Sequence, residues 1–238
     1  MGGSIYENIQ LPDDTRGRPY VILNMVHSID GRAAIEGKAS RLGTDTDRNV
    51  MRTLRSRADA VMVGGGTIRA EKLSLSLDAE DTRSVPRAVI LTNTGDVPLE
   101  SNLVRDRRQD VLVLLPGTAG KDVERSLAPF AEIRRVPATA YGRIDVSRAL
   151  EIMKSDYGID ILLCEGGTTL NQALISANLV DELFITKAPV LVGTIKETIA
   201  FPEDKPGDPR SLCLISSHQA GDEIFLRYSI QKGIAAKL

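Results

Sequence analysis

Two segments share a pattern that could bind a phosphate-bearing ligand: a hydrophobic run, a cluster of glycines, and a hydroxyl residue where a helix could begin. They are AVMVGGGT at residues 60–67 and ILLCEGGTTL at residues 161–170. Glycine lets a backbone approach a ligand closely, and free N–H groups at a helix N-terminus attract anions. The pair predicts a site for a cofactor with a pyrophosphate, while either loop alone could be only a tight turn. Neither contains the G-x-G-x-x-G or G-K-[ST] sequence of dinucleotide-fold dehydrogenases and P-loop enzymes.

A third polar segment, NMVHSIDGR at residues 24–32, directly follows a hydrophobic run. Asn24, Ser28 and Asp30 could therefore place hydrogen-bonding groups at the same sheet edge as the glycine loops. The alternative is a simple turn at Asp30-Gly31 with Ser28 as a cap. His27 is expected to be an ordinary packed or surface histidine.

Charged residues add two further candidates. Glu165 follows four apolar residues and precedes two glycines, which predicts a carboxylate at the ligand-binding edge, the alternative being an ordinary loop carboxylate. One predicted helix carries the arginines Arg48, Arg52, Arg55 and Arg57. Guanidinium groups match phosphate bidentately, so this helix could bind a substrate phosphate, or it could simply be solvated.

Strand and helix patterns alternate along the chain, which predicts an α/β fold with a mostly parallel sheet and helices on both faces. Strands are expected at residues 20–26, 60–64, 88–92, 110–115, 132–136, 160–164, 182–189, 212–217 and 223–230. Helices are expected at residues 47–57, from Thr67, and at 121–130, 147–157 and 170–178. The last two strands are joined by HQAGD without a helix and so predict a C-terminal antiparallel hairpin.

The segment boundaries follow from the same patterns. Thr44 and Asp47 fit the Ser/Thr-x-x-Asp/Glu signal of a helix start. Residues 1–18 are polar and are expected to form a flexible or loosely docked arm. Residues 19–238 are expected to form a single domain, because no composition break or repeat divides them.

Composition excludes several classes of function. The 30 Lys and Arg residues against 32 Asp and Glu residues give no electrostatic footprint for nucleic acid or an anionic membrane. Cys164 and Cys213, with two histidines, make neither a disulfide framework nor a convincing metal site. No run approaches the roughly 18 apolar residues of a membrane helix, and the N-terminus lacks the apolar core of a signal peptide. These features lead us to expect a cytoplasmic protein.

The chain resembles the reductase family of riboflavin biosynthesis, whose fold is like that of dihydrofolate reductase. The matching blocks are NMVHSIDGRAAI at 24–35, SRLG at 40–43, LRSRADAVMVGGGTIRAE at 54–71, LLCEGGTTLNQALISANLVDEL at 162–183 and APVLVG at 188–193. These blocks keep the family's order and spacing over residues 19–230. The most specific motifs among them are S-x-D-G and EGG-x-x-LN. The resemblance implies a three-layer α/β/α fold and a stand-alone NADPH-dependent reductase. The zinc-deaminase signature of the bifunctional relatives is absent, so no deamination is expected.

The resemblance also assigns residues to the site. Its cofactor contacts fall on Gly64, Thr67, Glu71, Asn93, Gly166, Gly167, Thr168, Thr169, Leu170 and Asn171. Its substrate contacts fall on Asn24, Ser40, Arg41, Arg55, Leu75 and Glu165. The implied catalytic residues are Asn24, which would hold the opening sugar, Glu165, which would hydrogen-bond the substrate, and Asp30, which would order the S-x-D-G loop. No metal is implied.

The family reaction opens a ribosylamine ring and delivers hydride to the sugar C1′, giving a ribityl chain. Asn24 with Ser40 and Arg41 is similar to the archaeal and fungal type, which acts on the 2,5-diaminopyrimidinone 5′-phosphate before deamination. The alternatives are a reductase of the same fold for another heterocycle, such as a dihydropterin, and a non-catalytic dinucleotide-binding module. A homodimer is expected because members of the family form one.

One departure from the family pattern concerns the substrate phosphate. Asp78 occupies the place of a family arginine that contacts the substrate, and a carboxylate repels a phosphate. Either other arginines bind the phosphate, with Arg41, Arg55, Arg83 and Arg87 as the candidates, or the substrate carries none.

Overall fold

The computed structural model describes residues 5–12, 17–70, 74–75, 77, 85–105, 108–193, 200 and 210–235. Its strands are β1 (Tyr20–His27), β2 (Ala60–Gly64), β3 (Arg87–Leu91), β4 (Val111–Pro116), β5 (Glu132–Val136), β6 (Ile161–Cys164), β7 (Glu182–Lys187), β8 (Arg210–Ala220) and β9 (Glu223–Ala235). Its helices are α1 (Asp45–Arg55), α2 (Gly65–Ala70), α3 (Asn102–Arg105), α4 (Lys121–Leu127), α5 (Val146–Tyr157) and α6 (Thr168–Ser176), with a 3₁₀ turn, η1, at Ala39–Arg41.

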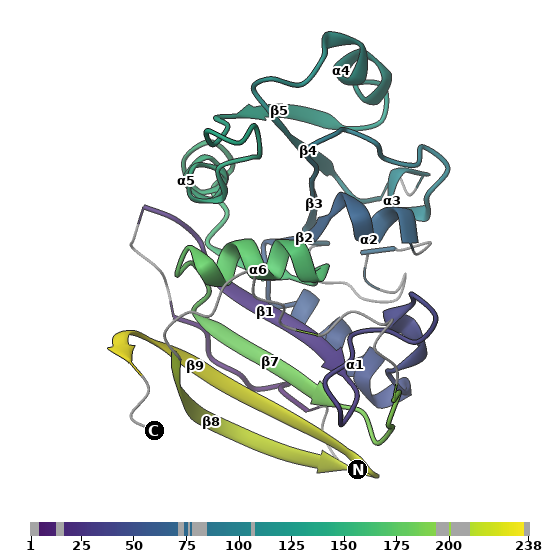
Figure 1. Cartoon of the computed structure of the whole chain (residues 1–238), viewed down its shortest axis with the longest axis vertical. Coiled ribbons are helices and arrows are strands. Elements are labelled where there is room, and N and C mark those ends of the chain that lie inside the picture. Colours follow the sequence, from purple (N-terminus) through teal and green to yellow (C-terminus); the bar gives the residue numbers. More distant parts are fainter. Residues whose placement is uncertain are drawn as a thin grey trace.

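All of these strands join one sheet in the order β5-β4-β3-β2-β6-β1-β7-β9-β8 (Figure 1). Neighbouring strands from β5 to β7 are parallel, whereas β9 runs antiparallel to both β7 and β8. β2 and β4 are buried almost throughout, as strands covered on both faces must be. The mostly parallel sheet and its C-terminal antiparallel hairpin are thus confirmed.

The two faces of the sheet carry separate hydrophobic cores, because successive side chains of a strand point to opposite faces. Along β1, Tyr20 and Ile22 pack into one core, whereas Val21 and Leu23 pack into the other. Side chains of α1 to α4 complete the first core, and those of α5 and α6 complete the second. The predicted α/β/α layering is therefore confirmed.

The described part of the expected N-terminal arm is packed rather than free. Tyr6 is 6% exposed, and its ring meets the rings of Phe184 and His218 edge to face at centroid distances of 4.9 and 5.4 Å. Ile5, Ile9 and Leu11 pack around the same core. Of the flexible or loosely docked arm expected at residues 1–18, residues 5–12 are docked against the core, while the domain boundary at residue 19 stays a prediction.

Local signals explain most of the element boundaries. Thr44 caps α1 and accepts a hydrogen bond from the Thr46 backbone N–H, as the helix-start signal predicts. α5 ends at Gly158, which adopts the left-handed conformation that glycine tolerates. η1 and α3 were not predicted, because three or four residues are too few to show a helical period.

A buried charge cluster joins the hairpin to the parallel sheet. Glu182 on β7 accepts two hydrogen bonds from Arg227 on β9, at 2.7 and 2.9 Å, and a third from the Tyr20 hydroxyl at 2.8 Å. The start of β9 is thereby held beside β7 and β1. Within the residues that the structure describes, no helix has the length and apolar character needed to cross a membrane.

Candidate functional site

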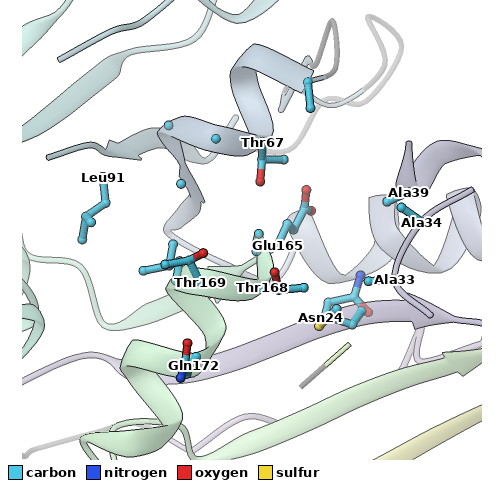
Figure 2. Close-up of a pocket in the computed structure, with 18 of the residues that line it drawn as sticks. Asn24, Ala33, Ala34, Ala39, Thr67, Leu91, Glu165, Thr168, Thr169 and Gln172 are labelled. Atoms are coloured by element: carbon cyan, nitrogen blue, oxygen red, sulfur yellow. The ribbon is translucent and has the colours of Figure 1, made fainter. Parts of the chain in front are cut away.

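A cavity of about 880 Å³ opens where the parallel strands end. In a parallel sheet the carboxyl ends of neighbouring strands lie at one edge, which is where such folds bind ligands. The lining follows the sheet order, from Leu91 at the end of β3, past Gly64 of β2 and Glu165 after β6, to Asn24 of β1. Figure 2 shows Thr67, Glu165 and Thr168 between Leu91 on one side and Asn24 on the other. This volume is near the upper end of the range for small-molecule sites, roughly 300–1,000 Å³.

The two glycine loops meet at the centre of this cavity. The Gly64 N–H donates a 2.7 Å hydrogen bond to the Gly166 carbonyl, and the Glu165 N–H donates to the Met62 carbonyl at 3.0 Å. Gly166 has a φ of +91°, a conformation that side chains disfavour, and the Gly166–Gly167 peptide bond is cis. A Cβ at Gly167 would lie 2.7 Å from Thr67 Oγ1. The loops therefore leave a backbone surface that side chains would fill.

The first turn of α6 contributes donors to this surface. Thr168, Thr169 and Leu170 line the cavity, and the first hydrogen bond of the helix runs from the Asn171 N–H to the Gly167 carbonyl. The three N–H groups before Asn171 have no partner inside the helix, as at every helix start. Donors and glycines together suit an anionic group such as a pyrophosphate.

An ion pair fixes Glu165 beside these loops. Arg55 on α1 donates from Nε and Nη2 to the two Glu165 carboxylate oxygens, each at 2.7 Å, and from Nη1 to the Ser74 carbonyl at 3.0 Å. The Arg55 side chain is only 4% exposed and that of Glu165 only 10%. Both groups line the cavity. Most Arg55 donors are therefore already engaged, which leaves little of this guanidinium for a substrate phosphate.

A second carboxylate, that of Asp47 on α1, lines the same end of the cavity. The pKa of Asp47 is raised to about 6, mainly by burial and also by the nearby carboxylates of Glu223 and Glu165, against the lowering effects of a hydrogen bond from Thr186 and the charge of Arg48. A Cβ at Gly43 would overlap Asp47 Oδ2. Gly43 therefore provides the space that this carboxylate occupies.

The opposite end of the cavity carries positive charge. Arg69 of α2 and Arg143 of the β5–α5 loop line it together with Asn93 and Thr94. Arg69 donates to the Asp96 carbonyl at 2.9 Å, and the Asn93 side-chain oxygen accepts from the Ile144 N–H at 2.8 Å. Asn93 therefore holds the loop that presents Arg143.

Most of the residues assigned by resemblance meet in this one cavity. Those that line it are Asn24, Ser40, Arg55, Gly64, Thr67, Asn93, Glu165, Gly166, Gly167, Thr168, Thr169 and Leu170. The assigned residues that do not line it are Asp30, Arg41, Leu75 and Asn171. Glu71 and Asp78, like Arg83, lie outside the described residues. The assigned roles stay predictions.

The assigned residues that do not line the cavity have structural roles. Asn171 is fully buried and donates to Met25 Sδ at 2.7 Å, Leu75 is also fully buried, and Arg41 pairs with Glu36 at the surface. Asp30 accepts from the Ser28 hydroxyl at 2.6 Å and from the Val192 and Gly193 N–H groups at 3.1 and 3.0 Å. Those bonds, that of Ser28 above all, lower the pKa of Asp30. Asp30 thus orders the S-x-D-G loop and ties it to residues 190–193.

Sequence reasoning missed several lining residues. They include Arg69, Arg143 and Gln172, and Asp47 was noticed only as part of a helix-start signal. For Asp47 the available signal was its position on the first turn of an arginine-rich helix, whereas nothing local marks Arg143. Within the described part of the chain, no group of three His, Cys, Asp or Glu side chains could hold a metal ion.

A long cavity at the strand ends, with two glycine loops and one free helix start, defines an α/β protein that binds a nucleotide-like ligand. The comparisons narrow this class. The model of the RibD C-terminal domain matches residues 19–226. The 2,5-diamino-6-ribosylamino-4(3H)-pyrimidinone 5′-phosphate reductase of Archaeoglobus fulgidus is 31% identical over 188 residues, covering 74% of this chain and 83% of that protein. The reductase of the same name from Methanothermobacter thermautotrophicus is 28% identical over 219 residues, covering 90% of this chain and 99% of that protein.

Solved structures agree with this placement. RibD of Acinetobacter baumannii superposes with a TM-score of 0.77 at 25% identity, over 92% of this chain and 60% of that one, so this chain spans about 60% of its length. A riboflavin biosynthesis reductase of Saccharomyces cerevisiae shares the fold, with a TM-score of 0.70, 20% identity and 92% coverage of both chains. The chain belongs to the RibD C-terminal domain family. The predicted reductase of riboflavin biosynthesis is confirmed at this level.

The Arg55–Glu165 pair yields a prediction for stability. Arg55→Ala would leave the Glu165 carboxylate buried without a partner, so we expect the free energy of unfolding at pH 7 to fall by about 3 kcal/mol, measured by urea denaturation. Arg52→Ala, on the same helix with an exposed hydrogen bond to Asn49, should cost less than about 0.5 kcal/mol. A loss below about 1 kcal/mol in Arg55→Ala would show that the pair is not a structural constraint.

Proposed function

We propose that this chain is an NADPH-dependent reductase that converts the ribosylamino group of a 2,5-diaminopyrimidinone 5′-phosphate into a ribitylamino group. The observation that carries the proposal is one continuous cavity with polar side chains at both ends. The two glycine loops, here called the glycine cradle, lie at its centre. The names of the archaeal relatives support this substrate.

The glycine cradle supports the placement of the cofactor pyrophosphate. The Gly64 N–H lies close enough to the Gly166 carbonyl for a 2.7 Å hydrogen bond, and a Cβ on Gly167 would lie only 2.7 Å from Thr67 Oγ1. Backbone, rather than side chains, thus forms the wall on which a pyrophosphate could rest, with the N–H groups of the first α6 turn as donors. Arg69 and Arg143 then suit the additional 2′-phosphate of NADPH.

The substrate would occupy the other end, between Asn24, Glu165 and α1. NADPH supplies the hydride that reduces the sugar C1′. Glu165, held rigid by Arg55, accepts hydrogen bonds from the substrate and orients it against the cofactor. Asn24 offers both a donor and an acceptor to the opened sugar. Arg48 lines this end with an exposed ion pair to Asp45, so it is better placed than Arg55 to exchange its partner for the substrate phosphate.

A homodimer through the hairpin edge forms part of the proposal. β8 is the last strand of the sheet, and Leu212, Leu214 and Ile215 on it are 42%, 54% and 46% exposed. A long apolar edge strand offers both unpaired backbone groups and hydrophobic surface to a second copy.

The function is tested by following NADPH absorbance with candidate substrates. We expect rapid oxidation with the phosphorylated diaminopyrimidinone and little with dihydropterin. Glu165→Gln should lower kcat at least about tenfold, because it loses a charged acceptor, while changing the Kd of NADPH less than about threefold. Glu151→Gln, on the exposed face of α5, is the matched control. Preference for dihydropterin, or NADPH binding without turnover of any pyrimidine, would overturn the proposed function.

The preference for NADPH over NADH is tested by changing a residue at the β3 end of the cavity. We expect NADPH to bind more tightly than NADH, and Arg143→Ala to weaken NADPH about tenfold, the scale of one charge-assisted contact, with little effect on NADH. Fluorescence titration measures both constants. Arg148→Ala, a nearby arginine paired with Glu151 outside the cavity, should change neither. An equal loss for both nucleotides would place the 2′-phosphate elsewhere.

The dimer is tested by light scattering coupled to size exclusion. Wild type is expected at twice the chain mass at micromolar concentration, and Leu214→Glu at the monomer mass, because it would bury a charge in the interface. The exposed position means that the variant should still fold. A monomeric wild type would contradict the proposal.

A further inference from the structure

Two carboxylates line the cavity within the described residues, and their environments differ. Glu165 is bound at both oxygens by Arg55, and this pairing holds it in place as a hydrogen-bond acceptor. Asp47 forms no ion pair with a described residue. Its side chain instead meets the Thr186 hydroxyl, and a Cβ at Gly43 would overlap it.

The elements packed around Asp47 surround it mainly with negative charge. β9 contributes Glu223, which is 2% exposed and accepts from the Thr44 hydroxyl and N–H. The end of β6 contributes Glu165, β7 contributes the uncharged Thr186, and α1 itself contributes Arg48. A carboxyl group between two other carboxylates in a part-buried site favours its protonated form. With the pKa raised to about 6, Asp47 can both hold and release a proton near neutral pH.

The proposed reaction needs such a group. Opening the ribosylamine ring breaks the C1′–O4′ bond, and its electron pair goes to O4′, which must take up a proton. The nitrogen lone pair forms a C1′=N bond in the same step. Hydride then adds to C1′, and the C=N electron pair returns to nitrogen. One hydride and one proton are therefore consumed for each ribityl group formed, and the proton must reach O4′ from a cavity-lining acid or from water.

We propose that Asp47 is the proton donor to O4′ during ring opening. This inference rests on the proposed function, because it assigns a step within that reaction. Among the described side chains that line the cavity, the others that ionise are arginines, which stay charged, and the Arg55-bound Glu165. The released carboxylate is reprotonated from solvent before the next turnover.

The first test compares Asp47→Asn with wild type across pH 5.5–8 under saturating NADPH and substrate. Asn keeps the size of Asp and can keep the hydrogen bond to Thr186, but it cannot donate an acidic proton. We expect kcat to fall about 100-fold at pH 5.5. Because the acid form of Asp47 is depleted above pH 6, the ratio of wild-type to variant kcat should shrink by about 50-fold as the pH rises to 8.

The kcat ratio and two further variants separate the role of Asp47 from other causes of a pH-dependent kcat. The substrate phosphate also titrates near pH 6, but it affects both proteins alike, so the ratio of the two kcat values removes it. Asp122→Asn, on α4 outside the cavity with a side chain 92% exposed, should keep kcat within about twofold. Asp47→Glu, which restores an acid at a shifted position, should recover part of kcat together with the falling limb above pH 6.

The second test needs neither substrate nor cofactor. A folded-state pKa above the ordinary value near 3.8 favours folding when the carboxyl is protonated, and this stability is lost as the pH rises through about 6. Asn does not titrate. The difference in Tm between Asp47→Asn and wild type should therefore grow by about 5 °C or more from pH 4 to pH 7.

Three outcomes would overturn the inference. They are a kcat loss below about threefold in Asp47→Asn, a kcat ratio that does not change with pH, and a Tm difference that is the same at pH 4 and pH 7. A failure of the proposed function is distinguishable, because it would appear as no NADPH oxidation by wild type itself. The Asp47 variants would then still report on the carboxyl group through Tm.

Discussion

The buried ion pair between Arg55 and Glu165 is the interaction on which the site depends. It joins the last turn of α1 to the residue that follows β6, across 110 positions of sequence. Two charges this deeply buried are stable only when their hydrogen bonds are nearly complete, and four Arg55 contacts, two to Glu165, one to Ser74 and one to Met51, meet that requirement. α1 is thereby fixed against the end of the parallel sheet, and the two form one side of the cavity.

Charge is distributed unevenly along the cavity. At the β3 end, Arg69 and Arg143 offer an anion two cationic groups, whereas the α1 end holds Asp47 and Glu165 beside Arg48 and Arg55. The glycine cradle between them carries no side-chain charge. A ligand with phosphates towards one end and a proton-consuming reaction at the other would match this arrangement. The neighbouring strand β7 and the hairpin also contribute, because β7 supplies Thr186 and the start of β9 supplies Glu223 next to Asp47.

The sequence predicted the parts of the site that are local. A hydrophobic run followed by glycines and threonines identifies a strand, a loop and a helix start, and parallel strands must end at one edge, so the meeting of Gly64 with Gly166 follows. The mostly parallel sheet and the hairpin follow from the same alternation of patterns, whereas the order of the strands in the sheet was not predicted. The family motifs then added residues, such as Ser40, whose position in the cavity no periodicity would indicate.

The parts of the site that the sequence did not predict depend on contacts between distant segments of the chain. Arg55 was interpreted as a phosphate ligand because an arginine in a helix does not reveal its partner, and only the fold shows that Glu165 occupies most of its donors. Asn171 lies in the most specific motif and yet packs against Met25 and Cys164, outside the cavity. Asp47 has a local role in a helix-start signal, but its raised pKa comes from burial and from Glu223, 176 positions later in the chain.

The most direct measurement of the central claim is the fate of the hydride. The protein would be incubated with NADPH carrying deuterium at both C4 positions and with the phosphorylated diaminopyrimidinone, and the product analysed by mass spectrometry and NMR. Our account predicts one deuterium on C1′ of a ribityl chain for each NADPH consumed. NADPH oxidation that leaves C1′ without deuterium, or a ribosylamine that remains unreduced, would contradict it.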